Sequence, residues 1–233
     1  MSPSIQNEEV TNLRLLASHP EVENVRTFVF EAGGFTWFAG QCLGYRLPQA
    51  GDTEAENQRW FTIASAPSEG EIHISTRISQ SKFKQALNAM KVGDSIEAFG
   101  LEGDFTWEDD PSNPVTLVAG GIGITPYRSI LLMRAATGRP LNGTLLYFNR
   151  TSDVPFRSEL EMLKAVHREF AMHIIVGEQI SADAILKHAP DAARQTVYLS
   201  GPEAMVDAVG TALLHRAVDV KQDWFPGYDE KNY

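Results

Sequence analysis

Hydrophobic and polar positions alternate over short runs in the first half of the chain. This two-residue period predicts half-buried β-strands, which we expect at 10–17, 24–31, 41–47, 59–64, 71–78 and 94–99. Turn-forming residues at 33–34, 48–51, 67–70 and 93–94 separate these runs. Several short strands at this spacing favour an antiparallel barrel or sandwich, with one helix at 82–90 where the apolar spacing becomes helical.

The second half shows a different pattern, in which short apolar runs alternate with stretches of helical periodicity. Strands are expected at 115–119, 144–148, 172–176 and 196–199. Helices are expected from the glycine-rich segment after the first of these strands to about 137, and then at 155–170, 181–188 and 202–216. Strands that alternate with helices indicate βαβ units and a doubly wound parallel sheet.

The change of pattern coincides with a polar, proline-containing segment at 108–114. The charge changes there too: residues 1–112 carry 8 Lys and Arg against 17 Asp and Glu, whereas residues 113–233 carry 12 against 13. We interpret the segment as a linker and divide the chain into domains at 1–112 and 113–233.

Composition removes several classes of function. A hydrophobic share of 43% is enough for folded cores, and a net charge of −10 argues against binding to nucleic acid or to anionic lipid. The single Cys42 excludes an internal disulfide or a four-cysteine cluster, and the six histidines lack ligand spacing, so no metal site is expected. We find no apolar run of about 20 residues and no leader pattern, which predicts a cytoplasmic protein. The sequence indicates no oligomeric state.

The strongest local signal is the glycine-rich segment AGGIGITP at 119–126, which follows an apolar strand and opens a helix. Glycines such as Gly121 and Gly123 let a ligand approach the backbone, and Thr125 is expected to cap the helix. The free N–H groups of the helix start suit a phosphate. The alternative is a tight turn without a ligand.

Two further strand ends are candidates for the same site. Ser200 and Gly201 end one strand, shortly before Met205 at a helix start, and two such loops form the ligand crevice of a doubly wound sheet. Arg150 follows another strand, where an NAD-preferring site usually has an acidic residue, so it favours NADPH through its 2′-phosphate. Asp153 nearby weakens this argument. An ordinary connection and a solvated arginine are the alternatives.

In the first half, residues 59–62 (RWFT) combine an anion partner, aromatic surface and a hydroxyl. Strand alternation places Arg59 and Phe61 on one face and Trp60 and Thr62 on the other. Residues 75–77 and the helix start at 81–84 add further candidates for anion binding. An arginine beside aromatic residues in a purely structural strand is the alternative.

Together these segments resemble the ferredoxin–NADP reductase superfamily of flavoproteins over nearly the whole chain. Residues 59–62 are similar to its Arg-x-Tyr-Ser/Thr flavin motif, and 120–126 and 198–205 are similar to its two nucleotide loops. Residues 223–228 resemble the Phe-x-Gly-Tyr ending of some bacterial members. The resemblance implies a six-stranded antiparallel Greek-key β-barrel that binds FAD, followed by an α/β doubly wound parallel-sheet domain that binds NAD(P)H.

The resemblance also implies roles for individual residues. Arg59 would pair with the FAD pyrophosphate, Phe61 would stack on the isoalloxazine and Thr62 would bond near flavin N5. Thr62, Ser200 and Phe225 would serve catalysis. The residues implied in cofactor binding are Arg59, Trp60, Phe61, Thr62, Thr76, Arg77, Ser81, Lys82, Phe83, Gly121, Gly123, Thr125, Arg150, Gly201, Met205 and Tyr228.

The implied reaction passes a hydride from the nicotinamide to flavin N5 and then electrons to an acceptor, which is a ferredoxin, a flavodoxin or a small molecule. A diaphorase or ferric-chelate reductase, an electron-transfer subunit of a larger enzyme and a non-catalytic nucleotide sensor are the alternatives. The acidic first half is a poor match for an acidic protein acceptor, although Lys82, Lys84 and Lys91 offer local positive charge. Near the C-terminus, Phe225 or Tyr228, rather than Tyr233, is expected to cover the flavin.

Overall fold

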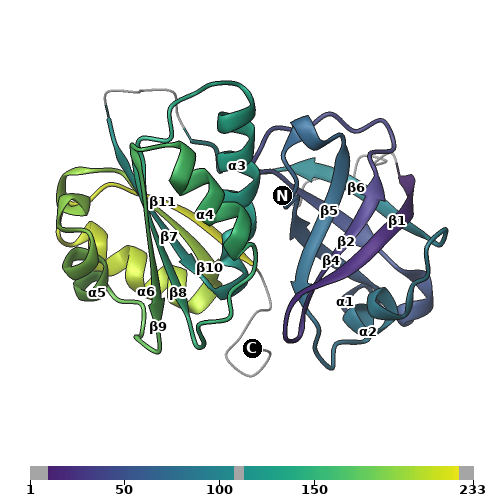
Figure 1. The fold of residues 1–233 in the computed structure, drawn as a ribbon. Helices are drawn as coiled ribbons and strands as arrows, with labels where there is room; N and C mark the ends of the chain where they lie inside the picture. The colour runs from purple at the N-terminus through teal and green to yellow at the C-terminus, as the bar shows by residue number, and fades with distance from the viewer. Residues whose placement is uncertain (1–9, 108–112, 226–233) are drawn as a thin grey trace, which may run out of the picture.

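The computed structural model describes residues 10–107 and 113–225, and it contains two sheets that form separate lobes (Figure 1). The first is an antiparallel sheet with the strand order β4-β3-β6-β1-β2-β5. Its strands are β1 (Thr11–Val22), β2 (Val25–Glu31), β3 (Cys42–Arg46), β4 (Gln58–Thr62), β5 (Glu71–Arg77) and β6 (Ser95–Glu102). The helical elements here are η1 (Pro48–Ala50), α1 (Glu54–Asn57), η2 (Pro67–Glu69) and α2 (Lys82–Ala89).

This sheet curls so that its two end strands approach each other. Just beyond β4, the Ala64 amide donates to the His73 carbonyl of β5 at 2.9 Å. Alternate side chains such as Leu43 and Phe28 fill the interior, because successive residues of a strand point to opposite faces. Helix α2 adds the fully buried Phe83 to the same core. The predicted antiparallel six-stranded unit is confirmed.

The second sheet is parallel, with the strand order β11-β10-β7-β8-β9. Its strands are β7 (Val115–Gly120), β8 (Gly143–Asn149), β9 (Phe170–Val176), β10 (Val197–Pro202) and β11 (Val220–Phe225). The helical elements are η3 (Gly121–Ile124), α3 (Thr125–Ala136), α4 (Arg157–Val166), α5 (Ala182–His188), η4 (Pro190–Arg194) and α6 (Glu203–Leu214).

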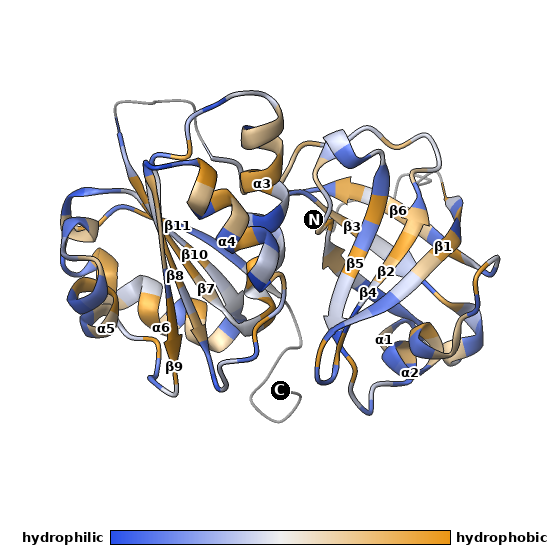
Figure 2. Cartoon of the chain, viewed as in Figure 1, coloured by the Kyte–Doolittle hydropathy of each residue, from blue (hydrophilic) through white to orange (hydrophobic). Residues whose placement is uncertain are grey.

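Helices cover both faces of the parallel sheet (Figure 1). Leu117 and Tyr147 pack with α3 and α4 on the face toward the first lobe, whereas Val118 and Leu146 pack with α5 and α6 on the other face. Figure 2 shows these strands as mainly hydrophobic, with the hydrophilic residues toward the outside of the helices. Burial on both faces is the rule for parallel sheets, and the doubly wound class is confirmed.

Two predicted elements were wrong in extent, and one strand was missed. Strand β1 continues to Val22 because it leaves β6 after Arg14 and pairs with β2 from Leu15 onward. The helix expected at 155–170 covers only Arg157–Val166, since Phe170 begins β9 and is buried against the sheet. Strand β11 was missed, because its polar residues resemble neither a buried nor an alternating strand.

The domain boundary at 112/113 stays a prediction, because residues 108–112 lie outside the described chain. Phe105 and Trp107, just before that segment, pack into the core of the parallel-sheet lobe with Tyr127 of α3. The connecting segment therefore contributes side chains to the second lobe. None of the helices in the described ranges 10–107 and 113–225 is both long and apolar enough to span a membrane.

Candidate functional site

The first candidate region is a group of cations at one end of the antiparallel lobe. Arg59 of β4, Arg77 at the end of β5 and Lys84 of α2 are near enough for their charges to interact. Lys84 is only 4% exposed, and burial together with the charges of both arginines lowers its pKa to about 7. Like charges held this closely favour an anion among them.

Hydroxyl groups complete this cationic group. Arg59 Nη2 donates to Ser81 Oγ at 3.3 Å, and its Nη1 donates to the backbone oxygens of Ala55 and Gln58, both at 2.6 Å. The buried Nε of Arg77 has no hydrogen-bond partner among the described residues. A buried donor of this kind points to a missing acceptor.

Two residues implied at this site lie elsewhere. The exposed Lys82 binds Glu56 at 2.5 Å, and Phe83 is fully buried in the core. Their side chains therefore do not face the cationic group. Of these two residues, only the backbone N–H groups at the start of α2 remain available to bind an anion. Lys84, two positions further along α2, was not among the implied cofactor residues, because the direction of its side chain depends on how α2 packs.

On β4, the side chain of Phe61 does not lie where its implied role in flavin stacking requires. Phe61 is 4% exposed and lies in the barrel core, with its ring centroid 6.0 Å from that of Tyr45. A ring buried in this way has no free face for stacking. Trp60 is partly exposed on the opposite face of the strand, in an edge contact with Phe99 at 5.6 Å. Thr62 shares that face and pairs across the sheet with Cys42.

The second candidate region is formed by two loops at the carboxyl ends of β7 and β10, as the sequence predicts. A Cβ added at Gly123 would lie 2.4 Å from the backbone oxygen of Ser200, so the two loops touch and only glycine fits. A Cβ added at Gly120 would lie 3.0 Å from the Met205 side chain. Gly121 adopts a φ of 54°, which is also typical of glycine.

The predicted cap of α3 is wrong in detail. Helix α3 begins at Thr125 itself, and the Thr125 hydroxyl donates to the Ile122 carbonyl at 3.2 Å. The hydroxyl therefore caps no N–H group of the helix. The Thr125 N–H donates to the Ile122 carbonyl of the preceding turn, and Pro126 has no N–H group, so this helix start offers fewer free N–H groups than the sequence predicts.

The two lobes approach each other at a carboxylate that was not selected from the sequence. Ser200 is fully buried, and its Oγ donates to Asp223 Oδ2 at 3.1 Å. Burial raises the pKa of Asp223 to about 6, although the bond from Ser200 opposes this shift. Burial and the charge of Asp223 also raise the pKa of Cys42 on β3 to about 11. Asp223 could have been selected only from its pairing with Ser200 between β10 and β11, and β11 was not predicted from the sequence.

Three further implied residues are placed only in part. Arg150 is exposed just after β8, as expected. Phe225 is the last residue of β11, directly across from Pro202 of β10. Tyr228 lies outside the described residues, as does Tyr233, so the prediction that an aromatic ring near the C-terminus covers the flavin stays a prediction.

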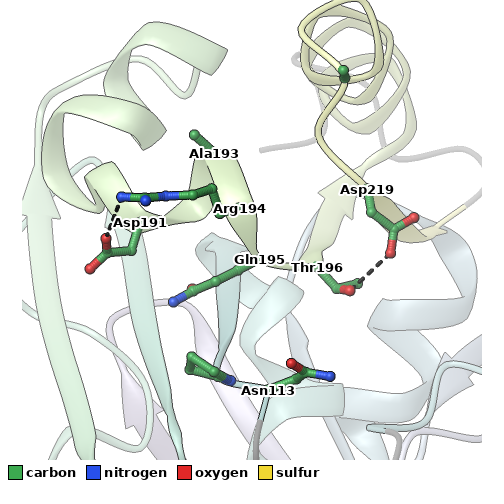
Figure 3. A pocket seen from close by; sticks show the side chains of 9 residues that line it. Asn113, Asp191, Ala193, Arg194, Gln195, Thr196 and Asp219 are labelled. Atoms are coloured by element: carbon green, nitrogen blue, oxygen red, sulfur yellow. Dashed lines mark hydrogen bonds and ion pairs between the residues drawn. The ribbon is translucent and has the colours of Figure 1, made fainter.

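A hollow of about 560 Å³ lies at the opposite edge of the parallel sheet (Figure 3). Asn113, Thr196 and Asp219 line it, and they lie just ahead of β7, β10 and β11, respectively. Ligands of doubly wound sheets bind outside the carboxyl ends of the strands. This hollow is therefore not the candidate site.

Comparison with known proteins supports the assignment of the second lobe. Residues 117–211 match the oxidoreductase NAD-binding domain family. The chain is 29% identical over 216 residues to the reductase component of propane 2-monooxygenase from Mycolicibacterium goodii, which covers 83% of this chain and 60% of that protein. It is 32% identical over 157 residues to ferredoxin–NADP reductase B from Sorangium cellulosum, which covers 64% of this chain and 63% of that protein.

Solved structures share the arrangement of both lobes. The cytochrome P450 reductase GcoB from Amycolatopsis superposes with a TM-score of 0.79 at 19% identity, over 93% of this chain and 70% of that one. Ferredoxin–NADP⁺ reductase from Plasmodium falciparum superposes with a TM-score of 0.77 at 16% identity, over 95% and 97%. The chain spans only 51–60% of the length of the first curated relatives. The matched domain, the relatives and the shared fold agree with the sequence motifs and confirm the resemblance to the ferredoxin–NADP reductase superfamily.

Proposed function

We propose that the chain is an FAD-dependent NAD(P)H oxidoreductase that delivers electrons to a separate acceptor. FAD, when bound, supplies the redox chemistry by accepting a hydride from the nicotinamide and releasing electrons singly. The protein binds the two cofactors, orients them and excludes water.

The cationic group of Arg59, Arg77 and Lys84 carries this proposal. Its concentrated charge fits a diphosphate, which is doubly charged and rich in acceptor oxygens, and so does Arg77 Nε, which has no hydrogen-bond partner in the part of the chain that the structure describes. The same lobe is otherwise strongly acidic, with 17 carboxylates against 8 cations in residues 1–112. Three cations gathered at one buried place in such a domain indicate a binding site rather than an average surface.

In the parallel-sheet lobe, the glycine loops and the start of α3 fit the phosphates of NAD(P)H. Thr62 and the Ser200–Asp223 pair lie where the two lobes face each other, as the charge of Asp223 on Cys42 indicates. We therefore assign Thr62 to the flavin side and Ser200 to the nicotinamide side of the reaction. Trp60 replaces Phe61 as the aromatic candidate on β4, because it keeps exposed surface.

The test begins with the purified protein, which should absorb as an oxidised flavin and release FAD rather than FMN on denaturation. Turnover should then be measured with NADH and NADPH against ferricyanide, a ferric chelate, a ferredoxin and a flavodoxin. A colourless protein that cannot be reconstituted with FAD would contradict the proposal.

A protein acceptor is favoured over a small molecule by one observation. The curated relatives include reductase components of propane and glycine betaine monooxygenases, which by name serve an oxygenase partner. Strong turnover with ferricyanide but none with any redox protein would favour the diaphorase alternative.

Coenzyme choice is proposed from Arg150. Its exposed position at the carboxyl end of β8 suits a 2′-phosphate, so NADPH should be preferred. Arg150→Ala should raise the KM for NADPH about fivefold and leave the KM for NADH almost unchanged. The same variant at Arg157, which pairs with Glu161 on α4, is the matched control. Equal effects of Arg150→Ala on both coenzymes would remove this role.

A further inference from the structure

A buried arginine joins the two lobes beside the candidate site. Arg128 of α3 is 5% exposed, although it carries a permanent charge. Its Nη1 and Nη2 each donate at 3.0 Å to one oxygen of Glu69, which belongs to η2 in the antiparallel lobe. Its Nε and Nη2 each donate at 2.8 Å to one oxygen of Glu159, which belongs to α4 in its own lobe.

The remaining donor of Arg128 also crosses between the lobes, because Nη1 donates to the Ala64 carbonyl at 2.8 Å. All five guanidinium N–H groups are thus used, in two bidentate pairs and one bond to the backbone. The ring of Phe156 covers the guanidinium at 5.1 Å. Phe156 has a φ of 60°, an unusual conformation for a bulky residue, which the surrounding packing must maintain.

The contacts reach both halves of the candidate site by short stretches of chain. Ala64 lies two residues beyond Thr62 of the flavin strand, and Arg128 lies one helical turn after Thr125 at the start of α3. The neighbouring Ser129 hydroxyl donates to the Ser65 carbonyl at 2.6 Å, which ties the same two segments again. The link therefore bypasses the connecting segment and joins α3 directly to the segment that follows β4.

Glu69 is held ready for this contact from its own side. Its Oε2 accepts the Ala66 amide at 2.6 Å, so the carboxylate is fixed before it meets Arg128. Burial disfavours the charge, yet the bonds from Arg128 hold the pKa of Glu69 below its usual value. An ion pair so well satisfied fixes geometry more than it adds stability.

We propose that Arg128, through Glu69 and Ala64, is a positioning residue that sets the distance between the flavin strand and the nicotinamide loops. This inference rests on the proposed function. Hydride transfer is sensitive to distance, and a misplacement of about 1 Å can lower a rate a hundredfold. The ion pair of Arg128 with Glu69 connects the two lobes, whereas its ion pair with Glu159 lies within the parallel-sheet lobe.

The two ion pairs of Arg128 allow a matched test, in which one variant weakens each pair. Glu69→Gln weakens only the contact between the lobes, and its amide oxygen can still accept the Ala66 amide. Glu159→Gln weakens only the contact within one lobe, and Glu161→Gln removes an exposed pair with Arg157 on the same helix as the control. Arg128→Lys restores the charge with three donors in place of five, so its effect should be partial.

The flavoprotein is mixed with excess NADH or NADPH in a stopped-flow instrument. At saturating coenzyme, Glu69→Gln should lower the rate of flavin reduction at least tenfold and weaken the long-wavelength charge-transfer absorbance. Coenzyme Kd should stay within threefold and FAD content should be unchanged. Glu159→Gln should lower the rate less than threefold, and Glu161→Gln should match the wild type.

Hydrogen exchange of the purified protein provides a readout independent of turnover. Glu69→Gln should increase exchange both at residues 64–70 and at residues 125–136. A wild-type rate and wild-type exchange in Glu69→Gln would overturn the inference, as would a loss in Glu159→Gln equal to that in Glu69→Gln. A wild-type protein without FAD, or not reduced by either coenzyme, would instead refute the proposed function, and the exchange experiment would still decide on the Arg128 link.

Discussion

The two proposed nucleotide-binding regions differ in their chemistry. The region in the antiparallel lobe gathers charged side chains, Arg59, Arg77 and Lys84, around a place of limited exposure. The region in the parallel-sheet lobe gathers backbone, because Gly123 touches the chain at Ser200 and leaves no room for a side chain. The only cation proposed there is the exposed Arg150 at its margin.

This difference suits cofactors with different residence times. Several charge-assisted bonds to a buried diphosphate slow dissociation, which is appropriate for a flavin that remains bound. Backbone N–H groups and a helix start provide weaker attraction with good shape, which is appropriate for a coenzyme that must leave after each turnover. We therefore expect substitutions of side chains to be most harmful in the first region, and substitutions of glycines in the second.

The largest effect is expected from Arg59→Ala. A charge-assisted hydrogen bond is worth about 1.5–3 kcal/mol, so FAD affinity should fall roughly ten- to a hundredfold, while coenzyme affinity should change little. Flavin retained after dialysis, measured by absorbance, is the readout. Arg14→Ala, which removes an exposed pair with Glu31, is the control. Equal retention by the Arg59 variant and the wild type would show that Arg59 does not bind the diphosphate.

Gly123→Ala should have the next largest effect, and in the other region. The added Cβ would lie 2.4 Å from the Ser200 oxygen, so one of the two loops must shift. Overpacking of this kind costs about 1–3 kcal/mol, and coenzyme Kd should rise about tenfold in a titration followed by flavin absorbance. The FAD content should remain that of the wild type. Loss of both cofactors together would mean that the two regions are not separable.

Much of the fold could be predicted from the sequence, because hydrophobic period and turn residues act locally. The errors lie where tertiary contacts decide. Strand β11 carries Lys221, Gln222 and Asp223, and only its position beside β10 makes it a strand. Phe170 continues an apolar stretch that reads equally well as helix, and its pairing with Gly143 decides for β9.

The candidate site could be predicted less completely. The glycine loops were found because their geometry requires glycine, which leaves a mark in the sequence. Lys84 was considered only as part of the helix start at 81–84 and as local positive charge, and Arg128 was assigned no role, since their importance depends on burial of charge, and the sequence does not reveal which lysine or arginine is buried. Asp223 was missed because its partner Ser200 is 23 residues away and belongs to another strand.

Asp223 lies where the two lobes approach each other, and a pH-dependent effect is expected there. Burial raises its pKa from 3.8 to about 6, so its ionised form is disfavoured in the folded protein. The group therefore contributes full stability below about pH 4, and this contribution is lost as the pH rises to about 6. Asp223→Asn should match the wild type in Tm near pH 4 and exceed it by several degrees at pH 8. An equal Tm difference at both pH values would exclude titration of Asp223 as the cause.

The smallest effect is expected from a lysine that seemed the better candidate in the sequence. Lys82 is exposed and paired with Glu56, and such surface pairs contribute little, so Lys82→Met should change FAD affinity less than twofold. Lys84→Met should differ from Lys82→Met in the proton uptake that accompanies FAD binding. Burial and the two arginines lower the pKa of Lys84 to about 7, so it is largely neutral at pH 8 until a diphosphate restores its proton. FAD binding to the apoprotein should therefore take up a proton at pH 8 and take up less at pH 6, where Lys84 is already charged. Calorimetry in buffers of different ionisation enthalpy measures this proton uptake. The uptake should be unchanged in Lys82→Met and absent in Lys84→Met. Proton uptake that persists in Lys84→Met would assign the proton to another group.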